Sequence, residues 1–567
     1  MSEKTAPNNN DADVIIVGGG SAGAVLAARL SEDPGRRVLL VEAGRDTLPG
    51  SVPEDIVDTF PRSYSNPAYT WPKLKARIRP GIDSRPYTQA RVMGGGSSLM
   101  GMWALRGLKS DYDGWQDSGA LGWGWEDVYP FFQKLERDPL HNSFHDAGNV
   151  AIRRIETSEW PPYIQSIEQA ANSLGFRSDQ NINEAQGDGF FPIPLSQENG
   201  ARVSSASAYL SLAVRRRPNL RIVTETEVLQ IDFDGKVVKG LSARNSVGSV
   251  YFAANEVIVC AGAIHSPALL LRSGIGPAEE LHALGISPVA NLPFVGRNLQ
   301  NHACINLGLT LPAAQRQDSA LRNYGVACLR ASSLVEGGTP SDLLLAFIGR
   351  TSMRPLGTRL GILGIFLYDP QSRGVVNLRR SHGELLPHIE FNLLAASEDS
   401  ARLASGLELA LKLLSTESTA NTWQDCVLLP PTLPLHRLNR PGLIADLQAA
   451  AGVLGFGAGS WMRRSILTSL MGKDAFINPR NFGALSRERL ENMCQTNVAP
   501  MFHVAGTCAM GAKGNVTTVV DPDCRVMGVS GLRVADASIM PRLPRANTNL
   551  PTMMIGERVA QLFRTAN

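Results

Sequence analysis

The chain has 567 residues, of which 43% are hydrophobic and 19% are charged, so it can bury a large core and is not generally disordered. This length allows one large domain or two to three ordinary ones. The formal net charge of +3 argues against nucleic acid or an anionic membrane as the main partner. The sequence also contains no uninterrupted apolar run long enough to span a bilayer.

Residues 1–12 are polar, and we expect them to form a disordered tail. This segment lacks the apolar core of a secretion signal, so export by the common route is not expected and the predicted location is the cytoplasm. The seven cysteines are scattered, odd in number and without a CxxC pair. We therefore expect core thiols rather than a disulfide framework or a zinc site, and no metal.

The first segment after the tail reads as strand, glycine turn, helix and strand. Residues 14–17 and 37–41 are short apolar runs typical of buried parallel strands, and residues 24–33 have a helical pattern. The turn contains Gly18, Gly20 and Gly23. In a dinucleotide-binding unit these glycines allow, respectively, the tight turn, the approach of a pyrophosphate to the backbone, and close packing of helix on strand. The helix N-terminus would then face the phosphates.

Glu42 ends the second strand, about 20 residues beyond the glycines, where a carboxylate can accept a hydrogen bond from a ribose hydroxyl. The same carboxylate disfavours the 2′-phosphate of NADP. The combination predicts dinucleotide binding, and the alternative is a glycine turn in another α/β fold. This motif does not separate FAD from NAD.

Other motifs lie further along the chain. Residues 91–98 (RVMGGGSS) form a second glycine-rich loop, which exposes backbone N–H groups and can lie flat against a planar or anionic ligand. The remaining motifs are GAIHSP at 262–267, VGRNLQNH at 295–302, FHVAGTCAMG at 502–511, GLRVADASIMP at 531–541 and ANTNLPTMMIGERVA at 546–560.

With these motifs in this order, the sequence resembles the glucose–methanol–choline (GMC) oxidoreductase family over nearly its whole length. Within that family it looks most like the branch of 5-hydroxymethylfurfural oxidases and aryl-alcohol oxidases. The resemblance implies FAD as the cofactor. It also implies a fold of class α/β plus α+β, with a Rossmann-like FAD-binding domain and a discontinuous substrate-binding domain built on a mostly antiparallel sheet.

The motif positions predict the domain limits. The FAD-binding domain is expected to comprise residues 13–155, 200–300 and 495–567, and the substrate-binding domain residues 156–199 and 301–494. Between residues 302 and 400, β-rich runs separated by turns indicate the antiparallel sheet. Residues 396–418 and 439–472 are predicted to be flanking helices.

The resemblance also implies the residues that hold FAD. The first glycine turn and Glu42 would bind the ADP half, the 91–98 loop would pack beside the isoalloxazine and pyrophosphate, and Val228 would contact the adenine. The expected set is Gly18, Gly20, Ser21, Ala22, Gly23, Glu42, Ala43, Arg91, Met93, Gly94, Gly95, Ser97, Ser98, Met100, Gly101, Met102, Val228, Asp536, Ala537, Asn547, Asn549 and Thr552. Relatives with a covalent flavin carry His where Leu99 stands, so binding should be non-covalent.

His503 and Asn547 occupy the positions of the family's catalytic pair. Alcohol oxidation needs a base with a suitable pKa within hydrogen-bond reach of the substrate oxygen, and a neutral amide can stabilise the developing alkoxide. The alternatives are a histidine that only hydrogen-bonds the flavin and an asparagine that only forms a turn. His265 and His302 also lie inside motifs, and we expect structural or flavin-side roles for them.

The substrate pocket is expected to be apolar and aromatic, formed by Met102, Trp103, Phe366, Leu367, Met501 and Phe502, together with Met100, where many relatives carry Asn. The furfural-oxidising branch has Trp where Phe502 stands, and many relatives have Pro where Val504 stands. Such walls favour a flat, mostly apolar substrate over a sugar.

The resemblance therefore implies oxidation of a primary aryl or furanic alcohol to the aldehyde, with possible further oxidation to the acid and with reduction of O2 to hydrogen peroxide. Two alternatives remain at this point. One is a dehydrogenase that uses another electron acceptor. The other is a non-redox flavoprotein similar to hydroxynitrile lyases.

Overall fold

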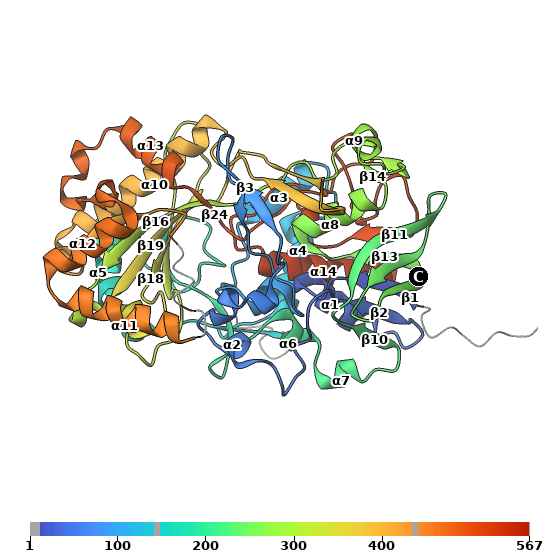
Figure 1. The fold of residues 1–567 in the computed structure, drawn as a ribbon, viewed down its shortest axis with the longest axis horizontal. Helices are drawn as coiled ribbons and strands as arrows, with labels where there is room; N and C mark the ends of the chain where they lie inside the picture. The colour runs from blue at the N-terminus through green and yellow to red at the C-terminus, as the bar shows by residue number, and fades with distance from the viewer. Residues whose placement is uncertain (1–11, 141–147, 434–438, 440–441, 566–567) are drawn as a thin grey trace, which may run out of the picture.

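The computed structural model describes residues 12–140, 148–433, 439 and 442–565. Its two large sheets lie toward opposite ends of the long axis (Figure 1). The expected fold class, α/β plus α+β, is confirmed. The predicted tail lies outside the described residues, except for Ala12, which already begins the first strand.

The seven-stranded sheet has a parallel core next to the N-terminal glycine turn. Its strands are almost wholly buried at β1 and β2, which explains their continuous apolar sequences. Five strands pair in parallel in the order β10 (Leu220–Val223), β2 (Val38–Val41), β1 (Ala12–Val17), β13 (Ser249–Val259) and β25 (Leu532–Val534). The expected strands at 14–17 and 37–41 are confirmed.

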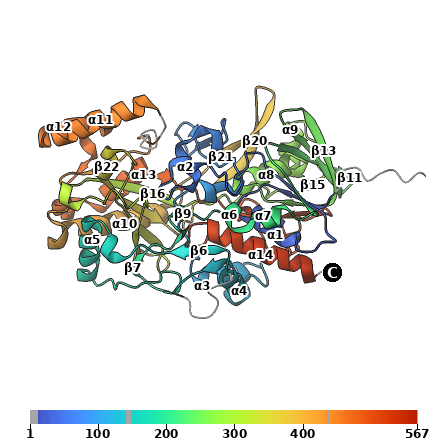
Figure 2. The same cartoon turned by 90° about the horizontal axis from the view of Figure 1, so that it is seen from below.

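Strand β13 is long enough to belong to two arrangements. Its second half pairs in parallel with β1, and its first half pairs antiparallel with β12 (Val237–Arg244), which pairs in turn with β11 (Glu227–Asp234). Three helices start near the carboxyl ends of the parallel strands: α1 (Ser21–Leu30), α8 (Gly262–Arg272) and α14 (Asn549–Thr565). Helices α1 and α14 pack side by side (Figure 2).

The eight-stranded sheet is antiparallel throughout, which confirms the prediction for this region. Helix α10 (Ser397–Ser415) packs on one of its faces, against β18 and β19. The strands are β7 (Gly189–Pro192), β16 (Ala303–Thr310), β17 (Ala327–Ala331), β18 (Leu343–Ile348), β19 (Leu360–Leu367), β22 (Cys426–Leu429), β23 (Phe476–Ile477) and β24 (Ala499–Pro500).

Two expectations change in detail. The strands β20 (Val375–Ser381) and β21 (Glu384–Glu390) do not join this sheet but form a separate four-stranded sheet with β3 (Lys75–Arg77) and β4 (Arg85–Pro86). The predicted helix at 439–472 is two helices, α11 (Leu443–Gly457) and α12 (Ser460–Met471), separated at Gly459, whose φ of 118° no helix can contain.

Smaller elements complete the described fold. They are α2 (Glu54–Val57), α3 (Lys109–Asp117), α4 (Trp125–Leu135), β5 (Glu136–Arg137), β6 (Val150–Arg153), α5 (Pro162–Ser173), β8 (Leu195–Glu198), β9 (Ala201–Arg202), α6 (Ser205–Tyr209), α7 (Leu212–Arg215), β14 (Ile275–Gly276), α9 (Ala278–Ala283), β15 (Ala290–Asn291) and α13 (Arg487–Asn497). The domain limits given above stay a prediction.

All seven cysteines are buried free thiols, so the expectation of core thiols is confirmed. Among the described residues, no group of three or more His, Cys, Asp or Glu side chains could hold a metal ion. No described helix combines the length and the apolar character needed to cross a membrane.

Candidate active site

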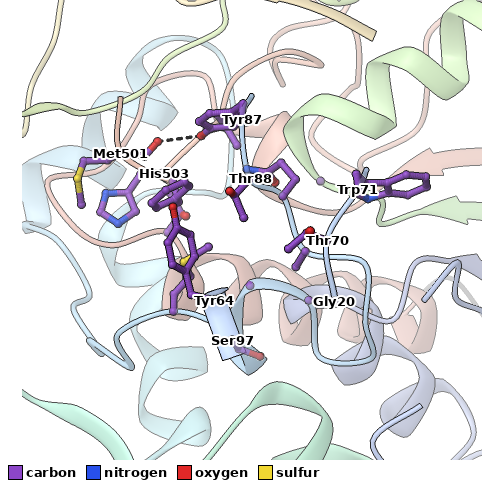
Figure 3. A pocket seen from close by; sticks show the side chains of 18 of the residues that line it. Gly20, Tyr64, Thr70, Trp71, Tyr87, Thr88, Ser97, Met501 and His503 are labelled. Atoms are coloured by element: carbon purple, nitrogen blue, oxygen red, sulfur yellow. Dashed lines mark hydrogen bonds between the residues drawn. The ribbon is translucent and has the colours of Figure 1, made fainter. Parts of the chain in front are cut away.

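A cavity of about 1110 Å³ lies between the two large sheets. Pockets for drug-sized ligands usually measure about 300–1,000 Å³, so this one can hold a larger ligand and a substrate together. Its wall combines the carboxyl ends of β1, β2 and β13 with one face of the eight-stranded sheet. In Figure 3, Gly20 and Trp71 lie toward one end, and His503, Met501 and Tyr64 toward the other.

The first end of the cavity lies where the connections from β1 and β13 diverge. This is the topological switch point at which open α/β sheets bind ligands. The N-termini of α1, α8 and α14 all reach the cavity wall, through Ser21, Gly262 and Asn549. The Ser21 hydroxyl donates to Asn549 Oδ1 at 2.7 Å, which holds two of these termini together. Free N–H groups at helix N-termini favour phosphate.

The glycines near the cavity are of two kinds: some are required by the backbone fold, and others leave space for a ligand. Gly18 has a φ of 101°, and a Cβ at Gly23 would lie 1.8 Å from the Gly18 carbonyl oxygen, so the fold itself needs both. Gly20 and Gly96 line the cavity without left-handed φ values. A Cβ at Gly20 would come no closer than 3.9 Å to another residue, and at Gly96 it would meet nothing within 4 Å. The space beside both backbones therefore fits a ligand such as a pyrophosphate.

Glu42 is buried in the cavity wall, where its carboxylate accepts hydrogen bonds from the backbone N–H groups of Gly19 and Gly44, each at 2.7 Å. Burial raises the pKa of Glu42, and these two N–H groups oppose that shift. Each carboxylate oxygen has a second lone pair for another donor. Glu42 thus closes the glycine turn and can still receive a ribose hydroxyl.

Most of the expected cofactor-contacting residues line the cavity. They are Gly18, Gly20, Ser21, Ala22, Glu42, Ala43, Gly95, Ser97, Met100, Gly101, Met102, Val228, Asp536, Ala537, Asn547, Asn549 and Thr552. Five others stand behind this wall, namely Gly23, Arg91, Met93, Gly94 and Ser98. Arg91, for example, lies 5.0 Å from the ring centroid of Trp71, which does line the cavity.

The other end of the cavity contains the expected catalytic pair. The Asn547 amide nitrogen donates to His503 Nε2 at 2.9 Å, and Asn547 Oδ1 accepts from the Tyr368 hydroxyl at 3.0 Å. On the far side of the His503 ring, Nδ1 lies 2.9 Å from Nδ1 of His302. The structure therefore brings together four polar side chains from distant parts of the sequence, and Asn547 and His503 both line the cavity.

The VGRNLQNH motif explains how the chain positions His503. The segment after this motif, β16, pairs with β24, and Gln300 bridges to Ala505 across the same edge. Asn301 binds the segment between β24 and Ala505. Its amide nitrogen donates to the Met501 carbonyl at 2.6 Å, and its amide oxygen accepts from the His503 backbone N–H at 3.2 Å. The end of the motif therefore lies beside the His503 segment and holds it in place.

Burial sets the protonation state of this centre. It lowers the pKa of His503 to about 4, and it also lowers the pKa of His302, with a contribution from His503. Burial also raises the pKa of the Tyr368 hydroxyl. At neutral pH both imidazoles are thus neutral and the phenol keeps its proton, so His503 is able to accept a proton.

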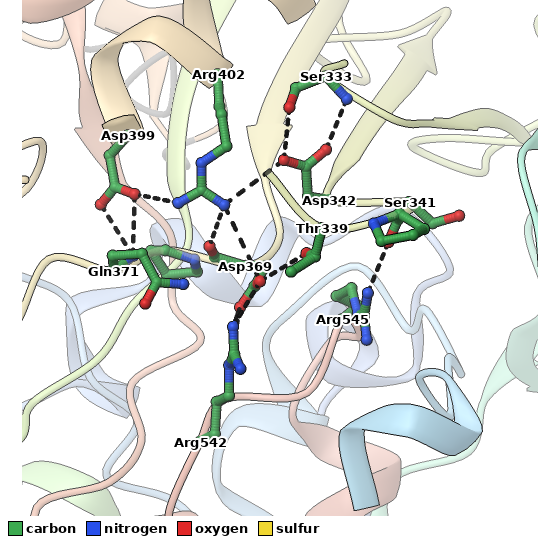
Figure 4. A network of polar contacts seen from close by, with 12 residues as sticks. Ser333, Thr339, Ser341, Asp342, Asp369, Gln371, Asp399, Arg402, Arg542 and Arg545 are labelled. Carbon is green, nitrogen blue, oxygen red and sulfur yellow. Dashed lines mark hydrogen bonds and ion pairs between the residues drawn. The ribbon is translucent and has the colours of Figure 1, made fainter. Parts of the chain in front are cut away.

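Ion pairs fix the loop that precedes Asn547, and Figure 4 shows the one between Arg542 and Asp369. Arg542 contacts Asp369, the neighbour of Tyr368, at 2.6 Å, and Arg545 contacts Asp111 at 2.7 Å. Burial alone would raise the pKa of Asp369, but Arg542 and a hydrogen bond from Thr339 outweigh it, and the pKa lies below the usual range. Asp369 therefore stays ionised and anchors the loop to the end of β19.

Aromatic rings form the wall beside His503. The Phe502 ring lies between Tyr64, at 5.3 Å and edge-on, and Tyr87, at 5.7 Å and stacked. The Tyr87 hydroxyl donates to the Met501 carbonyl at 2.8 Å (Figure 3), which fixes the loop that carries Phe502. Such a flat apolar wall suits an aromatic ring.

The opposite wall comes from the eight-stranded sheet and the segment after the second glycine loop. Phe366 meets Trp103 edge-on at 6.4 Å, and the buried Trp103 Nε1 finds no hydrogen-bond partner among the described residues. Met102 has a φ of 65°, a conformation costing about 1 kcal/mol or more that two hydrogen bonds from Ser196 to its carbonyl help to hold.

Leu367 does not line the cavity, contrary to the expectation for the pocket, and it is dropped from the substrate wall. Side chains alternate along a strand, so Phe366 and Leu367 must point to opposite faces of the sheet. On β19, Ile362 and Phe366 face the cavity, whereas Ile365 faces Gly406 of α10, and Leu367 shares the face of Ile365.

Several wall residues were not expected from the sequence. Tyr64, Trp71 and Tyr87 belong to the segment 58–90, which has few regular elements and covers the cavity. The available signal was the cluster of aromatic residues and prolines at 60–72, an unusual composition for an exposed loop. Leu99, at the position of the covalent link in some relatives, is fully buried against Ile56, away from the cavity.

One end of the cavity fits a dinucleotide, and the other end contains a neutral histidine beside an amide. This arrangement is that of a redox enzyme that uses a bound dinucleotide. Comparison with known proteins gives the family. Models of GMC oxidoreductases match residues 12–304 and 370–556, so the chain belongs to the GMC oxidoreductase family, whose members depend on FAD.

Individual relatives cover nearly the whole chain. A 5-(hydroxymethyl)furfural oxidase of Methylovorus sp. (strain MP688) is 38% identical, and the match covers 98% of each chain. A glucose dehydrogenase [FAD, quinone] of Drosophila pseudoobscura pseudoobscura is 31% identical over 98% of this chain and 87% of its own. The solved structure of pyridoxine 4-oxidase from Mesorbium loti matches with a TM-score of 0.78 and 27% identity, covering 98% of this chain and 99% of that one.

Proposed function

We propose that this protein oxidises a primary aryl or furanic alcohol to the aldehyde, with His503 as the base and Asn547 as the partner for the substrate oxygen. The observation that carries the proposal is the 2.9 Å contact between these two side chains, at the aromatic end of a cavity whose other end fits a dinucleotide. FAD bound in this cavity would supply the hydride acceptor, at N5, and a route for electrons to O2.

The two side chains divide the work on the hydroxyl group. The substrate oxygen would replace the direct contact between them, donating its proton to His503 Nε2 and accepting from the Asn547 amide. Because the pKa of His503 is lowered to about 4, the imidazole is unprotonated and ready to accept at neutral pH. The amide would stabilise the charge that develops on oxygen as the C–H bond breaks.

The walls support the proposed substrate class. Phe502, Tyr64 and Phe366 present ring faces and edges at this end of the cavity, which suits an aromatic or furanic ring. The relative named 5-(hydroxymethyl)furfural oxidase supports a furanic alcohol. Further oxidation of the aldehyde through its hydrate would use the same base, because a hydrate also has a carbon-bound hydroxyl group.

Two further points belong to the proposal. We expect FAD to be held non-covalently by the residues given above, because leucine at position 99 has no atom that could bond to the flavin and lies outside the cavity. Acid treatment should therefore release all of the flavin, and yellow colour left on the precipitate would contradict this. A dehydrogenase that uses a quinone is the second candidate, since one relative is named as such.

An anaerobic spectrum tests the function directly. The purified protein is mixed without air with 5-hydroxymethylfurfural or a benzylic alcohol, with glucose as the comparison, and is then exposed to air. Bleaching of the flavin by the aromatic alcohols, followed by rapid reoxidation with release of peroxide, is the expected result. Slow reoxidation would favour the dehydrogenase, and a flavin that no alcohol bleaches would contradict the proposal.

A further inference from the structure

His302 is a buried side chain in contact with His503, and the proposed function gives it no role. Its ring is fully buried, stacks on the Tyr368 ring with centroids 4.3 Å apart, and meets the His503 ring edge-on at 5.1 Å. The two Nδ1 atoms are 2.9 Å apart. When both rings are neutral, one of these nitrogens must donate and the other must accept, so a single proton lies between them.

The position of that proton decides whether His503 can act as a base toward the cavity. A neutral imidazole carries one proton, so a proton on Nδ1 leaves Nε2 free to accept, whereas a proton on Nε2 makes His503 a donor there. Which nitrogen is protonated depends on the hydrogen bond that the other one makes. For His503 that partner is His302.

The contacts of the Asn547 amide fix the direction. At the cavity side, the Tyr368 hydroxyl donates to Asn547 Oδ1, which turns the amide nitrogen toward His503 Nε2 and requires that nitrogen to accept. His503 therefore carries its proton on Nδ1 and donates to His302 Nδ1 at 2.9 Å, so the proton of the neutral His302 ring lies on Nε2, which reaches no hydrogen-bond partner among the described residues.

We propose that His302 is the positioning residue that holds His503 in its Nδ1–H tautomer, within a directed series of hydrogen bonds from Tyr368 through Asn547 and His503 to His302. The series leaves the lone pair of His503 Nε2 facing the cavity, where a substrate hydroxyl can donate to it. The expected effect of the tautomer on turnover rests on the proposed function, but the tautomer itself is a property of the protein.

Two substitutions separate tautomer control from packing. His302→Phe keeps a ring that can stack on Tyr368 but removes the acceptor, and His302→Asn offers an amide oxygen where Nδ1 stood. We expect kcat to fall by about 10-fold or more in His302→Phe with little change in KM, and to recover most of its value in His302→Asn. FAD content and thermal midpoint should match those of the wild type in both variants.

The direct readout is the ¹⁵N NMR spectrum of the histidine rings in the FAD-loaded protein, with the His503 signals assigned from their loss in His503→Gln. The wild type and His302→Asn should show a protonated Nδ1 on His503, and His302→Phe should not. A protonated Nε2 in the wild type, or an unchanged tautomer and kcat in His302→Phe, would overturn the inference. Full turnover by His503→Gln with the expected tautomer would instead contradict the proposed function alone.

Discussion

The two ends of the cavity are formed by different kinds of chemical group. At the dinucleotide end, backbone N–H groups, helix N-termini and missing side chains make the site, and residues close in sequence supply much of it: Gly18, Gly20, Ser21 and Glu42 span one turn, one helix and one strand. At the catalytic end, side chains make the site, and they come from four segments held together by His302, Tyr368 and the ion pairs of Figure 4.

This difference has a consequence for specificity. A site made of backbone groups is fixed as soon as the strand and helix pack, and it can recognise only what all dinucleotides share. A site made of side chains can be altered one residue at a time without disturbing the fold, as Phe502 and Met100 illustrate. The family relationship therefore follows from the first end, whereas the substrate follows from the second.

The largest effect should come from filling the dinucleotide end. Gly20→Val would place a Cβ 3.9 Å from the nearest other residue and add two methyl groups to it, so it should leave the fold intact while blocking the ligand. We expect the purified variant to be colourless and inactive, with a circular dichroism spectrum like that of the wild type. Gly114→Ala is a suitable control, since a Cβ there also meets nothing within 4 Å but lies outside the cavity. A yellow, active Gly20→Val variant would contradict the assignment of this end of the cavity to the dinucleotide.

The next largest effect should come from His503→Ala, which breaks the catalytic end alone. Loss of a general base typically lowers turnover by about 10²–10⁴-fold, and bound FAD should be unaffected because the dinucleotide end is untouched. Turnover is measured by peroxide release or dye reduction with 5-hydroxymethylfurfural. His282→Ala, on the exposed side of helix α9, provides the matched control. Near-normal turnover in His503→Ala would remove the base from the mechanism.

These contrasts also show how far the sequence could be interpreted. The glycine turn and Glu42 could be assigned because their partners are local and their spacing follows from strand and helix geometry. Four strands of the eight-stranded sheet, β16 to β19, were visible as β-rich runs, but Leu367 was placed in the pocket because sequence alone does not say which face of β19 is the cavity face. The structure supplied that choice.

The contact between His302 and His503 joins residues 201 positions apart. No local pattern encodes it, because the pairing of β16 with β24 creates it. Tyr368 presented the same difficulty: as the residue after β19 it looks like another core aromatic, and only its 3.0 Å contact with Asn547 shows a polar role. Sequence motifs could therefore single out His503 and Asn547, whose catalytic roles stay a prediction, but not the residues that contact them from behind.

Asn547→Ala should have a smaller effect than loss of the base. It removes one hydrogen bond to the developing alkoxide while His503 keeps its partner His302, so we expect kcat to fall by about 10–10³-fold, as for loss of one oxyanion donor. Asn547→Asp is an informative second variant, because its carboxylate would oppose the charge that develops on the substrate oxygen. An unchanged kcat in Asn547→Ala would exclude the amide from the mechanism.

The smallest effect is expected from moderate acid. The base works in its neutral form, so activity is present above the pKa of His503 and is lost as the pH falls through it. Burial lowers that pKa to about 4, so kcat/KM should change little between pH 7 and pH 5 and should fall about tenfold per unit only below pH 4. An ordinary histidine, with a pKa of about 6.5, would be only about 3% neutral at pH 5. A measured pKa near 6.5 in kcat/KM would show that the catalytic end is open to water when the enzyme is free, and that enclosure by Tyr64, Tyr87 and Phe502 does not set the state of the base.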